Sequence, residues 1–282
     1  MFNFEEWHHF QGAYFTTTLL ACIGALISSA EYLAISREFR SDGVFSWSVF
    51  SSRPECVNHE AIFRSIGFVF GYRGFVTLHS VRIISCVVLP IVLGNDLVTI
   101  PLMLIVIASS LILSFRDLVG NDGSDQMSLV VFGGLSIVSL SHDPLIRSAG
   151  LVFIAVQSIL SYVVAGVAKL LSPKWREGVA LAQIMNTRTY GLETVAHGLA
   201  RLPGAANKAL CWTVILVETF FFLVMFVPSP WFLLFLFWGL VFHAYNAIAM
   251  GLNTFFWSFL ATYPCIVFLN HLVVAVAFQG GP

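Results

Sequence analysis

Long apolar stretches recur along the whole chain, and they constrain its fold more than any other feature. A helix that crosses a bilayer needs about 20 mainly apolar residues. Eight stretches approach that length, at about 13–34, 74–93, 97–114, 127–140, 149–171, 209–227, 231–252 and 254–278. Only 10% of the 282 residues are charged, against about 25% in a soluble domain. We therefore predict an all-α polytopic transmembrane helical bundle of about eight spans.

Nothing divides this bundle, and we expect a single transmembrane domain over residues 1–282. Glu5 and Glu6 stand where a secretory signal peptide is positive, so we expect the first apolar segment to stay in the mature protein. Pro264 should kink the last span. The five cysteines have no CxxC spacing, which predicts neither a structural disulfide nor a cysteine-ligated metal.

Two polar segments, about 35–73 and 172–208, are too long for simple turns. Both carry apolar side chains, such as Phe45 and Trp47, so we expect short interfacial helices there. One face of an eight-span bundle collects twelve basic residues, and the other has only Arg147. The twelve are Arg37, Arg40, Arg53, Arg64, Arg73, Arg116, Lys169, Lys174, Arg176, Arg188, Arg201 and Lys208. This excess places that face in the cytoplasm and both termini outside.

Ionisable residues inside apolar spans are candidate functional groups, because burying them is costly. Lys169 ends the fifth span and shares a polar or small helical face with Ser158, Tyr162 and Gly166. The alternative is a lysine that extends to the membrane surface. Trp175 follows in a segment, about 173–188, for which we expect one amphipathic helix that covers Lys169.

Two more groups stand out. His243 forms a polar stripe with Asn246 in the seventh span; the alternative is an ordinary hydrogen-bonded contact between helices. Glu218 stands alone in the sixth span and has to be protonated or paired, with Lys169, His243 or Arg82 as candidates. Such a pair is a usual setting for acid–base chemistry, although it could equally be structural.

Other polar motifs point to no further site. The stretch 120–126 is a polar turn without the carboxylates of a calcium loop. His8-His9 and 58–60 have no partner at metal-ligand spacing, so we predict no metal site. The net charge of −1 leaves no basic stripe for nucleic acid, and we expect no nucleic-acid partner.

Two sequence blocks resemble a known family. The first contains Gln157, Tyr162, Ala165-Gly166-x-x-Lys169-Leu170 and Trp175-x-x-Gly178, and the second contains Glu218, Phe242-His243, Gly251 and Phe256. Together they resemble the vitamin K-dependent γ-carboxylases and, more broadly, the bacterial HTTM (horizontally transferred transmembrane) proteins. The likeness covers about 150–262 well and 10–145 only as a hydropathy pattern. Short members are similar to sporulation-delaying protein B, which helps to mature a secreted peptide toxin.

The resemblance implies an enzyme of a bacterial inner membrane that modifies or matures a small secreted precursor peptide. It implies a reduced quinone, of menaquinone or vitamin K type, as cofactor and Lys169 as the base. Glu218 and His243 would be its catalytic partners, and Gln157, Tyr162, Gly166, Trp175 and Asn246 would line the site. Besides the lipid bilayer and the peptide, a cytosolic or membrane partner protein is expected.

Two other functions stay open from the sequence. One is a non-enzymatic immunity or export-accessory membrane protein on the same scaffold. The other is a small transporter, which the lack of a visible inverted repeat disfavours.

Overall fold

The computed structural model describes residues 4–52, 67–116 and 123–279. Helices account for 82% of the chain, and the described residues contain no strand. The predicted all-α class is confirmed. The expectations for Arg53, Arg64, 58–60 and the first part of the 120–126 turn lie outside the described residues.

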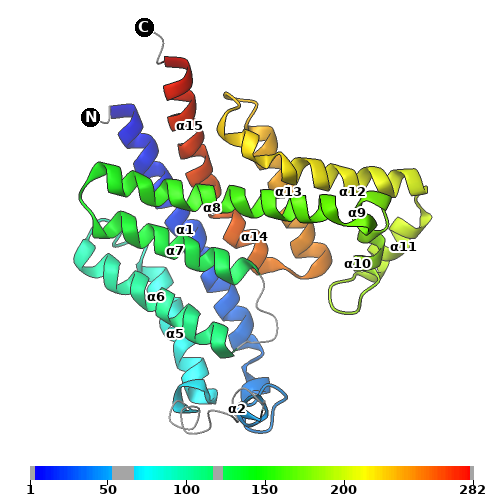
Figure 1. Ribbon diagram of the computed structural model, residues 1–282. Helices are drawn as coiled ribbons and strands as arrows, with labels where there is room; N and C mark the ends of the chain where they lie inside the picture. The colour runs from blue at the N-terminus through cyan, green and yellow to red at the C-terminus, as the bar shows by residue number, and fades with distance from the viewer. Residues whose placement is uncertain (1–3, 53–66, 117–122, 280–282) are drawn as a thin grey trace.

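Long helices run back and forth through the molecule (Figure 1). They are α1 (Phe4–Ala34), α5 (Tyr72–Val88), α6 (Asp96–Arg116), α7 (Gly123–Leu140), α8 (Pro144–Leu171), α12 (Gly204–Thr219), α13 (Leu233–Met250), α14 (Asn253–Leu260) and α15 (Tyr263–Gln279). Short elements lie between them: η1 (Ser36–Phe39), α2 (Trp47–Ser51), α9 (Pro173–Glu177), α10 (Ala180–Met185), α11 (Glu193–Arg201) and η2 (Phe221–Met225).

Six helical segments of the described chain are long and apolar enough to cross a membrane: α1 from His9 onward, α6, α7, α8, α13, and α14 with α15. The other two expected spans correspond to shorter helices. α5 has 17 residues and carries the buried His79 and Arg82, and α12 has 16 residues and continues into η2. The chain is a multi-pass membrane protein.

The last pass is interrupted where the sequence predicts a kink. α14 ends at Leu260 and α15 begins at Tyr263, directly before Pro264. Proline lacks an N–H and its ring clashes with the carbonyl four residues earlier, which prevents a continuous helix here. The Thr262 hydroxyl in the break hydrogen-bonds Ser158 of α8 over 2.8 Å, so the interruption also fixes α15 to the centre of the bundle.

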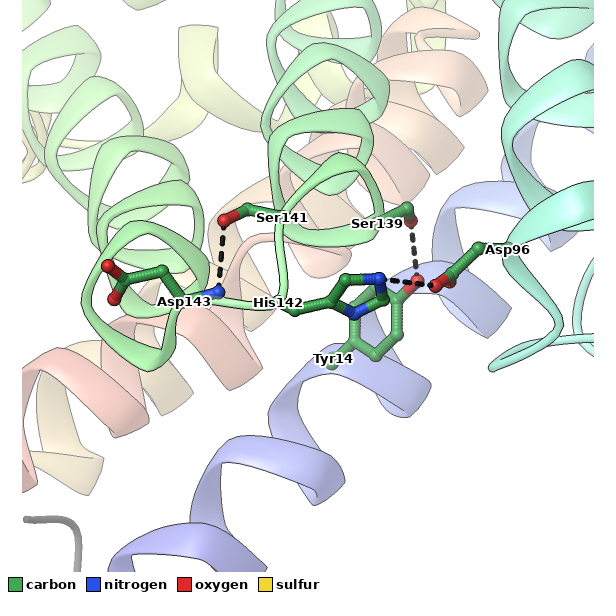
Figure 2. Close-up of polar contacts among 6 residues, drawn as sticks. All are labelled: Tyr14, Asp96, Ser139, Ser141, His142 and Asp143. Atoms are coloured by element: carbon green, nitrogen blue, oxygen red, sulfur yellow. Dashed lines mark hydrogen bonds and ion pairs between the residues drawn. The ribbon is translucent and has the colours of Figure 1, made fainter.

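The two ends of the bundle can be told apart by their contacts. The rings of His9 in α1 and His271 in α15 lie 4.5 Å apart, at the end where both chain termini are found (Figure 1). The α7–α8 turn lies near this end as well, because Ser139 at the end of α7 contacts Tyr14 in the first half of α1. There Tyr14 bonds Ser139 over 2.7 Å, as Figure 2 shows. The Asp143 carboxylate accepts a bond from the Leu145 N–H at the start of α8.

The described basic residues that the sequence groups together all lie toward the opposite end, in or beside the helix ends there. Asn253 and Glu31 mark this end with a 2.7 Å hydrogen bond between α14 and α1. Arg147 lies with Phe10 at the terminal end, its guanidinium 5.1 Å from the ring centre. This agrees with an even number of passes, and which end faces the cytoplasm stays a prediction.

A buried arginine organises the polar segment between α1 and α5. Arg116, at the end of α6, is 4% exposed and donates hydrogen bonds to the carbonyls of Phe45 and Phe70. Its guanidinium also lies between 5.3 and 5.8 Å from three aromatic ring centres, a cation–π arrangement. The rings are those of Phe39, Trp47 and Phe50. One cation thus joins η1, α2 and the start of α5.

The orientation can be tested with the single substitutions Ser41→Cys and Ser141→Cys, each introduced into a cysteine-free background. The two positions lie at opposite ends of the bundle, so the new thiols should react with an impermeant maleimide from opposite sides. In intact cells we expect the Ser141→Cys variant to be labelled and the Ser41→Cys variant to be protected until the membrane is opened. Labelling of the Ser41→Cys variant in intact cells would reverse the assigned orientation.

Replacing Arg116 should release the segment that it holds. We expect Arg116→Gln to lower stability by more than about 2 kcal/mol, because buried carbonyls lose a charged donor. Limited proteolysis between residues 36 and 52 should become faster. Arg73→Gln is the matched control, since Arg73 is exposed at the start of α5. Equal proteolysis of the two variants would show that Arg116 does not organise this segment.

Candidate functional site

A large cavity lies between α8 and α12 on one side and α13 on the other. Its volume is about 1060 Å³, and α7, α10 and α14 contribute further walls. α13 packs mainly on α14 and η2, which leaves this space beside α8 open. Seven of the eight residues singled out in the sequence lie on its wall: Gln157, Tyr162, Lys169, Trp175, Glu218, His243 and Asn246.

The eighth residue, Gly166, lies elsewhere. It is buried between α8 and α12, where a Cβ would come within 2.3 Å of the Thr219 backbone nitrogen and 2.7 Å of the Glu218 carbonyl carbon. Gly166 therefore does not line the cavity. Its missing side chain lets the backbones of α8 and α12 touch, as small residues often do between membrane helices.

This close approach brings an acid and a base together. Lys169 Nζ donates to Glu218 Oε2 over 2.5 Å. The side chains are 20% and 3% exposed, so the carboxylate is buried while the amine still reaches the cavity. Of the three partners considered for Glu218, the structure selects Lys169.

Arg82 belongs to a different part of the bundle. It donates to the Ser29 hydroxyl over 2.8 Å and to the Ala25 carbonyl of α1. Together with His79 it lines a second, polar cavity of about 50 Å³ between α1, α5, α6, α7 and α14.

A buried chain of hydrogen-bonded side chains borders the cavity. His243 Nε2 and the Tyr162 hydroxyl lie 2.8 Å apart, and Tyr162 contacts the Tyr263 hydroxyl at 3.2 Å. Gly239, one turn before His243, makes this possible, because a Cβ there would lie 2.3 Å from the Tyr263 oxygen. The imidazole also stacks on Phe259, with ring centres 4.5 Å apart. The His243 ring is thus held by a hydrogen bond at its edge and by a stacked aromatic ring on one face.

Trp175 covers the lysine end of the cavity. Lys169 Nζ lies 5.4 Å from the centre of the Trp175 ring, within cation–π range. α9 is attached to α12 because Trp212 donates its indole N–H to the Arg176 carbonyl.

The single amphipathic helix expected over 173–188 is wrong. The chain forms α9 and α10 instead, separated at Gly178, whose φ of +86° is left-handed. A left-handed glycine ends a helix at low cost. A Cβ on Gly178 would lie 2.4 Å from the Lys208 Cα, so the glycine also lets α9 approach α12 closely.

Most of the remaining wall is apolar, and part of it is open. Leu160 and Val164 of α8 and Val241 of α13 line the cavity and are exposed on the outside of the bundle. Exposed apolar side chains on membrane-spanning helices typically face lipid, so we expect the opening to lead toward the bilayer.

Several residues of this site were missed in the sequence. Tyr263, Phe255, Phe259 and Gly239 carry no polar pattern of their own, and only the folded contacts with Tyr162 and His243 bring them to the site. The sequence gives one indication of a role for Gly239. This small residue stands one helical turn before His243 in a run of large apolar residues.

The described residues contain no group of three or more His, Cys, Asp or Glu side chains placed to hold a metal ion. Comparison with protein-family models, with curated proteins and with solved structures finds no match to this chain.

Replacing Gly166 tests whether close packing sets the Lys169–Glu218 geometry. We expect Gly166→Ala to lower stability by about 1–3 kcal/mol, because the added methyl group overlaps the α12 backbone. Gly133→Ala, on an open face of α7, should be neutral or stabilising by up to about 1 kcal/mol. Thermal unfolding in detergent measures both. An unchanged Gly166→Ala protein would mean that the helices do not touch here.

Proposed function

We propose that this protein is a bacterial inner-membrane enzyme that uses the reduced form of a lipid quinone to modify or mature a secreted peptide. The observation that carries the proposal is the lipid-facing cavity with an acid–base pair at one end. The resemblance in the Lys169 and His243 blocks supplies the type of reaction, one similar to that of the vitamin K-dependent carboxylases.

The cavity residues fit a quinone of menaquinone or vitamin K type. Small-molecule sites usually measure roughly 300–1,000 Å³, and this cavity of about 1060 Å³ is slightly larger than that range. Phe242, Phe255 and Phe259 offer aromatic faces for a flat ring, and the apolar mouth suits an isoprenoid tail. When bound, the reduced quinone would supply, on reaction with oxygen, the strong base that such enzymes apply to a glutamate side chain.

Lys169 can act as a base only while its amine is neutral. Glu218 can accept the proton of the Lys169 amine. Transfer of that proton from Nζ to Oε2 converts the charged pair into a neutral pair, and the net charge stays zero. In an apolar environment the charged form loses hydration, which brings the two forms closer in free energy. Desolvated lysines serve as bases and nucleophiles elsewhere for this reason.

Tyr162 and His243 have a positioning role in this proposal. Their hydrogen bond joins α8 to α13 across the cavity, and Tyr263 supports it from α15. Trp175 limits the access of water to Lys169 from the α9 side. The pair is thus shielded on the α9 side, while the cavity stays open to lipid.

The test measures quinone binding and catalysis separately. Protein purified with its membrane lipids is extracted, and isoprenoid quinones are quantified by mass spectrometry. We expect Val164→Trp to reduce the quinone content about tenfold, since the ring fills the mouth. Val167→Trp, three residues along α8 but off the cavity wall, is the control and should retain quinone.

The lysine variants test the reaction. Lys169→Met and Lys169→Arg should retain quinone but abolish the protein-dependent consumption of the reduced form, because neither side chain gives a neutral amine and guanidinium stays protonated. Equal quinone content in the two tryptophan variants, or full turnover by Lys169→Arg, would contradict the proposal.

A further inference from the structure

Two carboxamides on the cavity wall have no hydrogen-bond partner among the residues that the structure describes. Gln157 of α8 and Asn246 of α13 both line the cavity and are partly exposed to it. Within the described chain neither side chain makes a hydrogen bond or an ion pair. Most other polar side chains on the inner faces of α8 and α13 are bonded, as Ser158, Tyr162 and His243 are.

Unbonded amides are costly at this depth. Gln157 lies near the middle of the 28-residue helix α8, where a membrane core offers little water. Moving an amide from water into a medium without hydrogen bonds costs roughly 4–8 kcal/mol. Two such groups on one lipid-facing cavity therefore indicate an occupant that supplies hydrogen bonds to them.

The chemistry of the carboxamide restricts this occupant. Each amide has an N–H₂ that donates and a C=O that accepts, so a ligand with only acceptor oxygens leaves the amide oxygen unpaired. A hydroxyl group both donates and accepts, and it satisfies either side. The amides carry no charge, which disfavours an ionic group beside either of them.

The surrounding rings indicate what carries that hydroxyl. Phe242 and Trp238 stack at 5.0 Å on α13 beside Asn246, and Phe255 and Phe259 stack at 5.1 Å on α14. All four line the cavity. Flat aromatic faces around polar edge groups suit a planar aromatic head.

We propose that Gln157 and Asn246 are specificity-determining residues that bind the hydroxyl groups of an aromatic amphiphile, a phenol or dihydroxyarene with an apolar tail. This rests on the proposed function and deepens it: the carboxamides distinguish the hydroxyl form of the ring from forms that carry only acceptor oxygens. Lys169 lies twelve residues further along α8, where it pairs with Glu218 of α12 beside Gly166. The carboxamides bind the hydroxyl groups of the head, and the ion pair lines the same cavity, where Lys169 acts as the base.

The test uses two probes that differ only in whether the ring oxygen carries a hydrogen or a methyl group. They are 2-dodecyl-1-naphthol and its methyl ether, neither of which needs a redox reagent. Binding to the purified protein in nanodiscs is followed by quenching of tryptophan fluorescence. We expect the wild-type protein to bind the naphthol about tenfold more tightly than the ether, which is the scale of one net hydrogen bond.

The variants locate this preference. Gln157→Leu and Asn246→Leu should each weaken naphthol binding about fivefold or more and leave ether binding unchanged. Gln183→Leu is the control, because Gln183 is exposed on α10 and does not line the cavity. It should leave the binding of both probes unchanged.

The outcomes separate this inference from the proposed function. If both probes bind equally to the wild-type protein, and Val164→Trp blocks both, the cavity takes lipid but the carboxamides do not select hydroxyls. If Gln157→Leu weakens both probes alike, the residue shapes the cavity and recognises nothing. If neither probe binds while quinone is retained in the extraction assay, the occupant has a different head and this inference is overturned alone.

Discussion

The ion pair between Lys169 and Glu218 is the contact on which the functional half of the bundle depends. A carboxylate that is 3% exposed between membrane helices needs a cationic or hydrogen-bonding partner. The partner is available because Gly166 has no side chain, so α12 lies directly against α8 one turn before the lysine. The pair in turn fixes the depth of Lys169, and Trp175 and the α9–α10 corner close over it.

Much of this could be predicted from the sequence because membrane helices leave strong signals. The apolar stretches located the passes, the excess of basic residues on one side distinguished the two ends, and Pro264 marked the break between α14 and α15. Seven candidate residues lie on one cavity wall for a simple reason. Polar side chains in apolar spans turn away from lipid, and a bundle of this size has few places to put them.

The remaining details depend on contacts between distant parts of the chain. Gly178 and Gly166 look alike in the sequence, yet one ends a helix in a left-handed conformation and the other allows two backbones to touch. The expectation of one helix over 173–188 is wrong because apolar spacing does not reveal that Gly178 is left-handed and packs against Lys208. Arg82 was a reasonable partner for Glu218 by depth alone, but it bonds α1 on the other side of the bundle.

The charged pair and the neutral amide of Gln157 lie at different depths of the cavity, and this arrangement suits an amphiphile that enters from the bilayer. The charged pair lies at the end of α8, close to the membrane surface, where residual hydration lowers the cost of an ion pair. Gln157 lies deep in the span, where a neutral amide costs far less than a charge. The Nε2 atom of the deeply placed His243 is hydrogen-bonded to Tyr162. Its Nδ1 atom is buried and has no partner in the described chain. The histidine therefore holds the wall together, and in our proposal recognition falls to the two carboxamides, which make no hydrogen bond within the described chain.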